Sequence, residues 1–143
     1  VLFSMYRNNE NVFQYLVDNY NSSKEQLLKI YRNHLPVIEI NTGVERILKS
    51  IKKKKGKIAI ITDGRIVTQE NKIKALGITS FLDFVSISEK AGAEKPSKLS
   101  FNLVMSKLPA EKYYYIADNF KEFICSKSIQ RRIKYLIHNQ QIG

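Results

Sequence analysis

The chain has 143 residues, 43% of them hydrophobic, which is enough for one domain with a buried core. Its net charge of +11 makes nucleic acid the first partner to consider, but the one dense run, Lys52–Lys55, has no aromatic residues between its lysines. No run of about 18 apolar residues is present, as a membrane span would need. A single cysteine argues against a disulfide framework. Composition therefore predicts a cytoplasmic globular domain and argues against a membrane or nucleic-acid partner.

In the first 40 residues, the pattern of apolar residues predicts helices only. Apolar residues recur at helical intervals from residue 9 to 33, with a break at Asn21-Ser22-Ser23. Ser22 and Glu25 have the spacing of a capping box for the second of these helices. Thr42 and Glu45 repeat that spacing and open a further helix, which Gly56 ends.

From residue 41 onward, short apolar runs alternate with helical patterns, which is typical of a parallel sheet covered on both faces. We therefore expect a doubly wound, Rossmann-like α/β domain over 41–143, preceded by a separate helical segment over 1–40. The expected strands span 57–62, 84–87, 113–117 and 135–137, and the expected helices span 66–76, 97–108 and 121–130.

Ligands of open parallel sheets bind beyond the carboxyl ends of the strands. The sequence places three kinds of polar group there. Thr62-Asp63-Gly64 follows the first strand, Lys95 lies in the loop after the second, and Asp118, Asn119 and Glu122 follow the third. A hydroxyl, backbone N–H groups and a lysine suit a phosphate, and carboxylates suit Mg²⁺. Taken singly, each has a plainer explanation as a turn, a surface lysine or a helix cap.

Three motifs in this order resemble those of the haloacid dehalogenase-like (HAD) hydrolases, most of which are phosphatases. IAIITDG (58–64) is similar to the family's second motif, GAEKPS (92–97) to its third, and YIADNFKEF (115–123) to its fourth. The similarity extends to YRNHLPVI (31–38) and GVERILKSI (43–51). It therefore covers at least residues 31–123.

This resemblance implies a role for each matching residue. Thr62 would hydrogen-bond the phosphoryl group with the backbone of Asp63 and Gly64, and Lys95 would balance charge between phosphate and nucleophile. Asp118 would hold Mg²⁺ directly or through water. Glu122, which stands where the family usually has aspartate, and Asn119 would assist. The resemblance implies a magnesium-dependent phosphatase that acts on a small phosphorylated metabolite through an aspartyl-phosphate.

The family's first motif, D-x-D on the opening strand, is absent. It supplies the nucleophile and the general acid/base of the reaction. The chain opens on Val1, so we expect the motif to lie upstream and residues 1–40 to be part of a helical cap. In the alternative, Val1–Tyr6 is a decayed first strand with Ser4 and Tyr6 in place of the aspartates. The protein would then be a noncatalytic binding protein.

In the family, the missing strand lies between the strands that carry the second and fourth motifs. Without it, two apolar strand edges would be exposed. We therefore expect this chain alone to be inactive. A further segment, another chain or a homo-oligomer would fill the gap, or the two flanking strands would close up.

Overall fold

The computed structural model describes residues 1–95 and 97–117 and the backbone of 133–137. The chain divides into two compact units, Val1–Leu35 and Pro36–Gly143, which we call the helical unit and the α/β unit. The predicted helix over 121–130 and the predicted metal-site residues Asp118, Asn119 and Glu122 lie outside the described residues.

The helical unit contains three helices, which end before the boundary at Leu35. They are α1 (Leu2–Arg7), α2 (Val12–Asn19) and α3 (Lys24–Asn33). The rings of Phe13 and Tyr31 meet edge to face, with centroids 5.8 Å apart, and this contact links α2 to α3.

The capping box of α3 lies one residue later than predicted. Ser23 is the N-cap, its hydroxyl accepts from Gln26 N, and the Gln26 side chain accepts from Ser23 N. The proposed pair of Ser22 and Glu25 is therefore wrong.

The segment from Leu2 to Arg7 is a helix, not a strand. Ser4 and Tyr6 thus lie on α1, within the helical unit. The alternative in which Val1–Tyr6 forms a decayed first strand of the sheet is wrong, and Ser4 and Tyr6 do not stand in for the missing aspartates.

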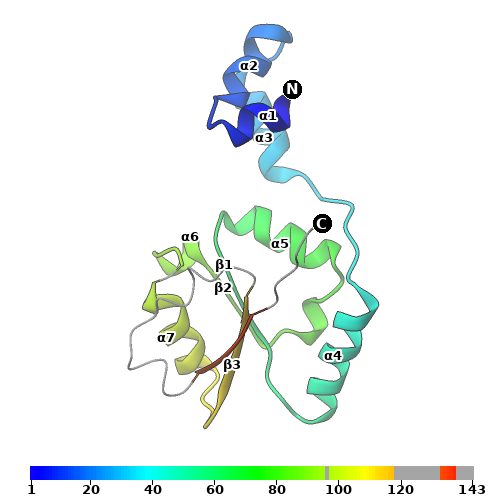
Figure 1. Ribbon diagram of the computed structural model, residues 1–143, viewed down its shortest axis with the longest axis vertical. Coiled ribbons are helices and arrows are strands. Elements are labelled where there is room, and N and C mark those ends of the chain that lie inside the picture. Colours follow the sequence, from blue (N-terminus) through cyan, green and yellow to red (C-terminus); the bar gives the residue numbers. More distant parts are fainter. Residues whose placement is uncertain (96, 118–132, 138–143) are drawn as a thin grey trace. The chain divides into compact units, whose positions relative to one another are not determined.

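The α/β unit shows the predicted alternation of strands and helices (Figure 1). Its elements are α4 (Thr42–Lys53), β1 (Ala59–Thr62), α5 (Ile66–Ala75), the 3-10 helix η1 (Thr79–Phe81), β2 (Phe84–Ile87), α6 (Ser88–Ala91), α7 (Lys98–Lys107), β3 (Tyr113–Ala117) and β4 (Ile133–Ile137).

The start of α4 also differs from the prediction. Its N-cap is Asn41, whose side chain accepts from Gly43 N at 2.8 Å, so Thr42 is the first helical residue and not the cap. The start of α7 agrees with the helix expected from residue 97, because Ser97 is its N-cap and accepts from Leu99 N. After α5, Gly77 has φ +66, which is typical of the glycine that ends a helix.

The described strands form two parallel pairs. β1 pairs with β2 from Ala59↔Phe84 to Thr62↔Ile87, and β3 pairs with β4 from Tyr113↔Ile133 to Ala117↔Ile137. No backbone pairing joins β1 to β3 within the described residues. The two strands therefore have not closed up, and each has an edge that the described strands leave unpaired.

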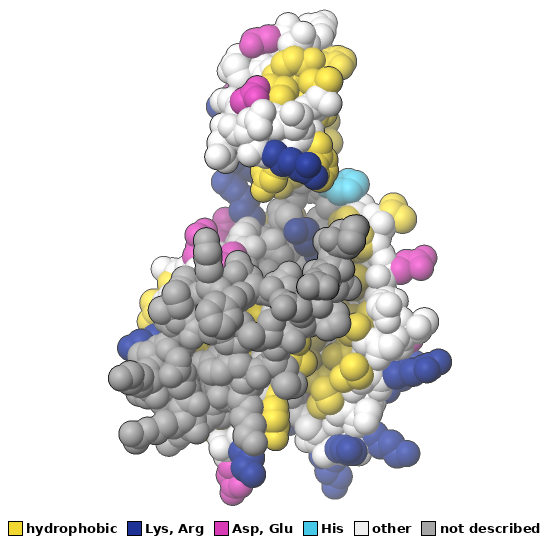
Figure 2. All heavy atoms as spheres, in the orientation of Figure 1, with side chains coloured by type: hydrophobic (Ala, Val, Ile, Leu, Met, Phe, Trp, Pro, Cys, Tyr) yellow, Lys and Arg dark blue, Asp and Glu magenta, His cyan; other side chains and the backbone are white. Residues whose placement is uncertain are grey.

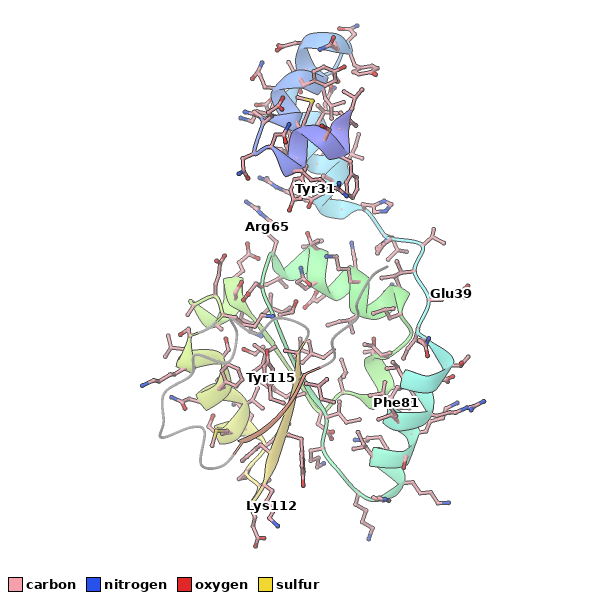
Figure 3. The ribbon with its side chains drawn as sticks, viewed as in Figure 1. Tyr31, Glu39, Arg65, Phe81, Lys112 and Tyr115 are labelled. Carbon is pink, nitrogen blue, oxygen red and sulfur yellow. The ribbon has the colours of Figure 1, made fainter. Side chains whose placement is uncertain are left out.

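Phe101 of α7, which is 3% exposed, connects the two pairs of strands. Ile61 of β1 and Tyr113 and Tyr115 of β3 pack against it. Its ring lies 5.0 Å from that of Tyr115, edge to face, and Figure 3 shows Tyr115 directed from β3 toward the side of α7. One helix thus holds strands from both pairs over a shared core.

Asp83, just before β2, ties α4 to the start of β1. Its carboxylate accepts from Lys52 Nζ at 2.9 Å, Ile58 N at 2.8 Å and Lys57 Nζ at 3.1 Å. The hydrogen bond from Lys52, followed by that from Ile58 N–H, holds the pKa of Asp83 well below its ordinary 3.8. This stabilisation is present above that ordinary value and is lost as pH falls toward the lower pKa of the folded state.

Large hydrophobic side chains remain exposed on β3 and α4. Tyr114 and Ile116 alternate along β3 with partly buried residues and are 63% and 62% exposed. Val44 and Ile47 are exposed on α4. Figure 2 shows hydrophobic side chains open to view on the α4 side of the α/β unit. Such surface is typical of an element that another segment covers.

Candidate functional site

The carboxyl ends of β1 and β2 lie level with each other, because Thr62 is paired with Ile87. Two short segments leave these ends: the turn Asp63-Gly64-Arg65 before α5, and α6 directly after β2. Gly64 has φ +130, a conformation that side-chain-bearing residues rarely adopt. The sheet register therefore sets a glycine turn beside the first residues of α6.

Ser88 and Glu89 of α6 hold this turn in place. Gly64 N donates to the Ser88 hydroxyl at 2.9 Å, and Ser88 is only 7% exposed. Ile66 N donates to Glu89 Oε2 at 2.7 Å, so a carboxylate from another element caps the start of α5. The turn after β1 and the start of α6 therefore form one hydrogen-bonded assembly.

The side chain of Asp63 brings the lysine loop to the same place. Its Oδ1 accepts from the backbone N of Lys95 at 3.0 Å, across 32 residues of sequence. The structure thus joins three of the predicted phosphate-binding residues, Asp63, Gly64 and Lys95, through the turn after β1. Thr62 directly precedes that turn and ends β1.

The Thr62 hydroxyl is oriented by a residue of α5. Its Oγ1 donates to Gln69 Oε1 at 2.8 Å, and the pair is partly buried. The other end of the Gln69 amide lies over the glycine turn, since a Cβ added to Gly64 would come within 2.6 Å of Gln69 Nε2. Gly64 therefore leaves the space through which Gln69 reaches Thr62.

An open pocket of about 400 Å³ lies beside the turn. Figure 3 shows Arg65, at the start of α5, projecting away from the strands at this end of the unit. The pocket is lined by Gly64, Arg65, Ser88, Glu89, Gly92, Ala93 and Glu94. A small polar molecule bound here would contact Gly64 and Arg65 of the turn that follows Thr62, whereas Thr62 and Lys95 themselves do not line the pocket.

The metal half of the predicted site is not described. Asp118, Asn119 and Glu122 fall outside the described ranges, although Ala117, the residue before Asp118, ends β3. Among the described residues, no three His, Cys, Asp or Glu side chains come together as a metal would require. In the same part of the chain, no helix is long and apolar enough to cross a membrane.

Four features of the site were not predicted from the sequence: Ser88, Glu89, Gln69 and the side-chain role of Asp63. Ser88 and Glu89 directly follow β2, so the rule that singled out Thr62 could also have singled them out. No local signal marks Gln69, because its contact with Thr62 depends on the way α5 leaves the turn.

A pair of buried serines tests whether the Ser88 contact stabilises the turn. Ser88→Ala should lower the free energy of unfolding by about 1–2 kcal/mol, because Gly64 N–H loses its buried partner. Ser86→Ala removes the same group at a residue 2% exposed, but Ser86 Oγ has no hydrogen-bond partner among the described residues. That variant should be neutral or more stable. Urea unfolding measures both, and equal losses would contradict the assignment.

Comparison with known proteins assigns the family. The family model described as haloacid dehalogenase-like hydrolase matches residues 3–134. No curated protein matches the chain.

Solved structures show the same fold at low identity. A hydrolase from Streptococcus pneumoniae is 15% identical, with a TM-score of 0.60 over 71% of this chain and 52% of its own. A candidate β-phosphoglucomutase from Thermotoga maritima is 20% identical, with a TM-score of 0.68 over 92% of this chain and 64% of its own. The HAD-hydrolase YfnB from Bacillus subtilis, solved with magnesium, is also 20% identical, with a TM-score of 0.58 over 85% and 60%.

This chain therefore spans 52–64% of the lengths of these three structures, and identities this low establish the fold alone. The family model covers most of the chain and agrees with the α/β architecture. The chain belongs to the haloacid dehalogenase-like hydrolases.

Proposed function

We propose that this chain carries the phosphate-binding part of a magnesium-dependent phosphatase for small phosphorylated metabolites. The observation that supports this most is the hydrogen bond from Lys95 N to Asp63 Oδ1. It brings a lysine-bearing loop to the turn after Thr62, at the end of a parallel sheet where ligands of such folds bind.

Thr62 and Lys95 would be the main phosphate contacts. A threonine hydroxyl can donate to a phosphoryl oxygen, and a lysine ammonium balances its negative charge. The Gly64 N–H already donates to Ser88, so its own contribution would require that hydrogen bond to be exchanged. Asp63 would act chiefly by holding the Lys95 loop through its carboxylate.

Magnesium is proposed from the chemistry of the residues that follow β3. Asp118, with Glu122 and Asn119, offers oxygen ligands of the kind that this hard cation prefers. A bound magnesium would neutralise charge on the phosphoryl oxygens. YfnB, with the same fold, was solved with magnesium bound.

The nucleophile would come from a further strand between β1 and β3. Both strands contact Phe101, yet they do not pair with each other in the part of the chain described. A strand in that position would satisfy both edges and could carry a D-x-D motif beside Thr62. Its first aspartate would attack phosphorus and displace the alcohol of the substrate, which the second carboxylate protonates. Water would then hydrolyse the aspartyl-phosphate and release phosphate. Without this strand the chain should bind phosphate but not turn it over.

The helical unit would be part of the cap that selects substrate, as such insertions cover active sites in related folds. A cytoplasmic location remains a prediction from composition.

The pocket beside Arg65 is large enough for a small polar leaving group.

Phosphate binding tests the proposed site. In the presence of Mg²⁺, the chain should bind inorganic phosphate weakly, with a Kd on the order of 1 mM, as followed by backbone amide shifts. Thr62→Val should weaken binding about fivefold and Lys95→Ala about tenfold, because each removes a donor to the anion.

Lys107→Ala provides the charge-matched control, since Lys107 is an exposed residue at the end of α7. It should leave Kd within about twofold of the starting chain, because an exposed distant charge is screened by salt. Equal losses of affinity for Lys95→Ala and Lys107→Ala would mean that phosphate binding depends on net charge and not on this site.

Adding a strand tests the proposed position of the nucleophile. A peptide of about ten residues rich in Val and Ile and ending in Asp-x-Asp should slow hydrogen exchange at amides of both β1 and β3. With Mg²⁺ it should also give turnover of p-nitrophenyl phosphate. The same peptide with Asn-x-Asn should slow exchange without turnover. Protection of neither strand, or of only one, would argue against a position for one strand between β1 and β3.

A further inference from the structure

Gln69 is the hydrogen-bond partner of the Thr62 hydroxyl, which is the donor in the proposed phosphate site. Its Oε1 accepts the Thr62 hydroxyl proton at 2.8 Å, so in this state that proton is not directed at a ligand. A hydroxyl has one proton and two lone pairs. Phosphate can receive the proton only if Gln69 releases it.

The amide can release the proton and still hold Thr62. Its nitrogen lies over Gly64, where a Cβ would be 2.6 Å from Nε2, so both ends of the amide face the turn. If the amide rotates by half a turn, Nε2 takes the position of Oε1. Its N–H then donates to Thr62 Oγ1, which becomes the acceptor of the hydrogen bond. Thr62 then keeps a hydrogen bond while its proton points to the ligand.

We propose that Gln69 is a positioning residue whose amide turns over when phosphate binds, switching Thr62 from a donor within the protein to a donor to the phosphoryl group. This inference rests on the proposed function. The juxtaposition of Thr62 Oγ1, Gln69 and the side-chain-free Gly64 carries it.

Two substitutions of Gln69 separate the role of its amide oxygen as acceptor from the role of its amide nitrogen as donor. Gln69→Glu keeps the acceptor and removes the donor, so the Thr62 proton stays on the protein. Gln69→Met has similar length and offers neither. We expect Gln69→Glu to weaken phosphate binding at least about tenfold and Gln69→Met about threefold, since the second variant leaves the Thr62 proton unclaimed.

Gln69→Glu also adds negative charge, and a double-mutant cycle with Thr62→Val removes that ambiguity. In the Thr62→Val background, the loss caused by Gln69→Glu should shrink to about threefold, which is the part due to charge. Lys72→Gln makes the same change in net charge at an exposed position of α5 and should change Kd less than about twofold.

The experiment measures Kd for inorganic phosphate with Mg²⁺ for each variant, together with its midpoint of thermal unfolding. A purely structural Gln69 would lower the midpoint and give equal fold-losses with and without the Thr62 hydroxyl, which would overturn the inference while leaving the proposed function intact. Failure of the starting chain to bind phosphate would overturn both.

Discussion

The hydrogen bond between Lys95 N and Asp63 Oδ1 is the contact on which the site depends. Loops cost conformational entropy to order, and a ligand that must order them binds more weakly. Here the protein orders these loops without a ligand, because Ser88, Glu89 and Lys95 are each hydrogen-bonded to the segment 63–66. The turn after β1 is therefore preorganised, and Thr62 is the residue that this arrangement presents.

The second constraint is the gap in the sheet. β1 and β3 share Phe101 as a packing partner, but no described strand lies between them. Tyr114 and Ile116 are in addition exposed on one face of β3. In the proposed function, binding and catalysis are therefore separable. The proposed phosphate contacts Thr62 and Lys95 belong to the described part of the chain, whereas the proposed nucleophile belongs to a strand outside it.

Much of the fold could be predicted from the sequence because its signals are local. Residues 84–87 and 113–117 are apolar runs bounded by turn residues, and both are strands with those bounds. The cap at Ser23 was misplaced by one residue because Ser22 and Ser23 are adjacent, and only backbone geometry chooses between them. Gln69 could not be predicted, since its contact with Thr62 depends on how α5 leaves the turn. The predicted metal residues, including Asp118, lie beyond what the structure describes.

The central claim is that the turn after β1 and the Lys95 loop form one oxyanion site. A crystal structure of the chain grown with inorganic phosphate and Mg²⁺ tests it most directly. We expect a phosphate whose oxygens lie about 3 Å from both Thr62 Oγ1 and Lys95 Nζ. A phosphate bound elsewhere, with Thr62 and Lys95 unable to reach one common anion, would contradict it.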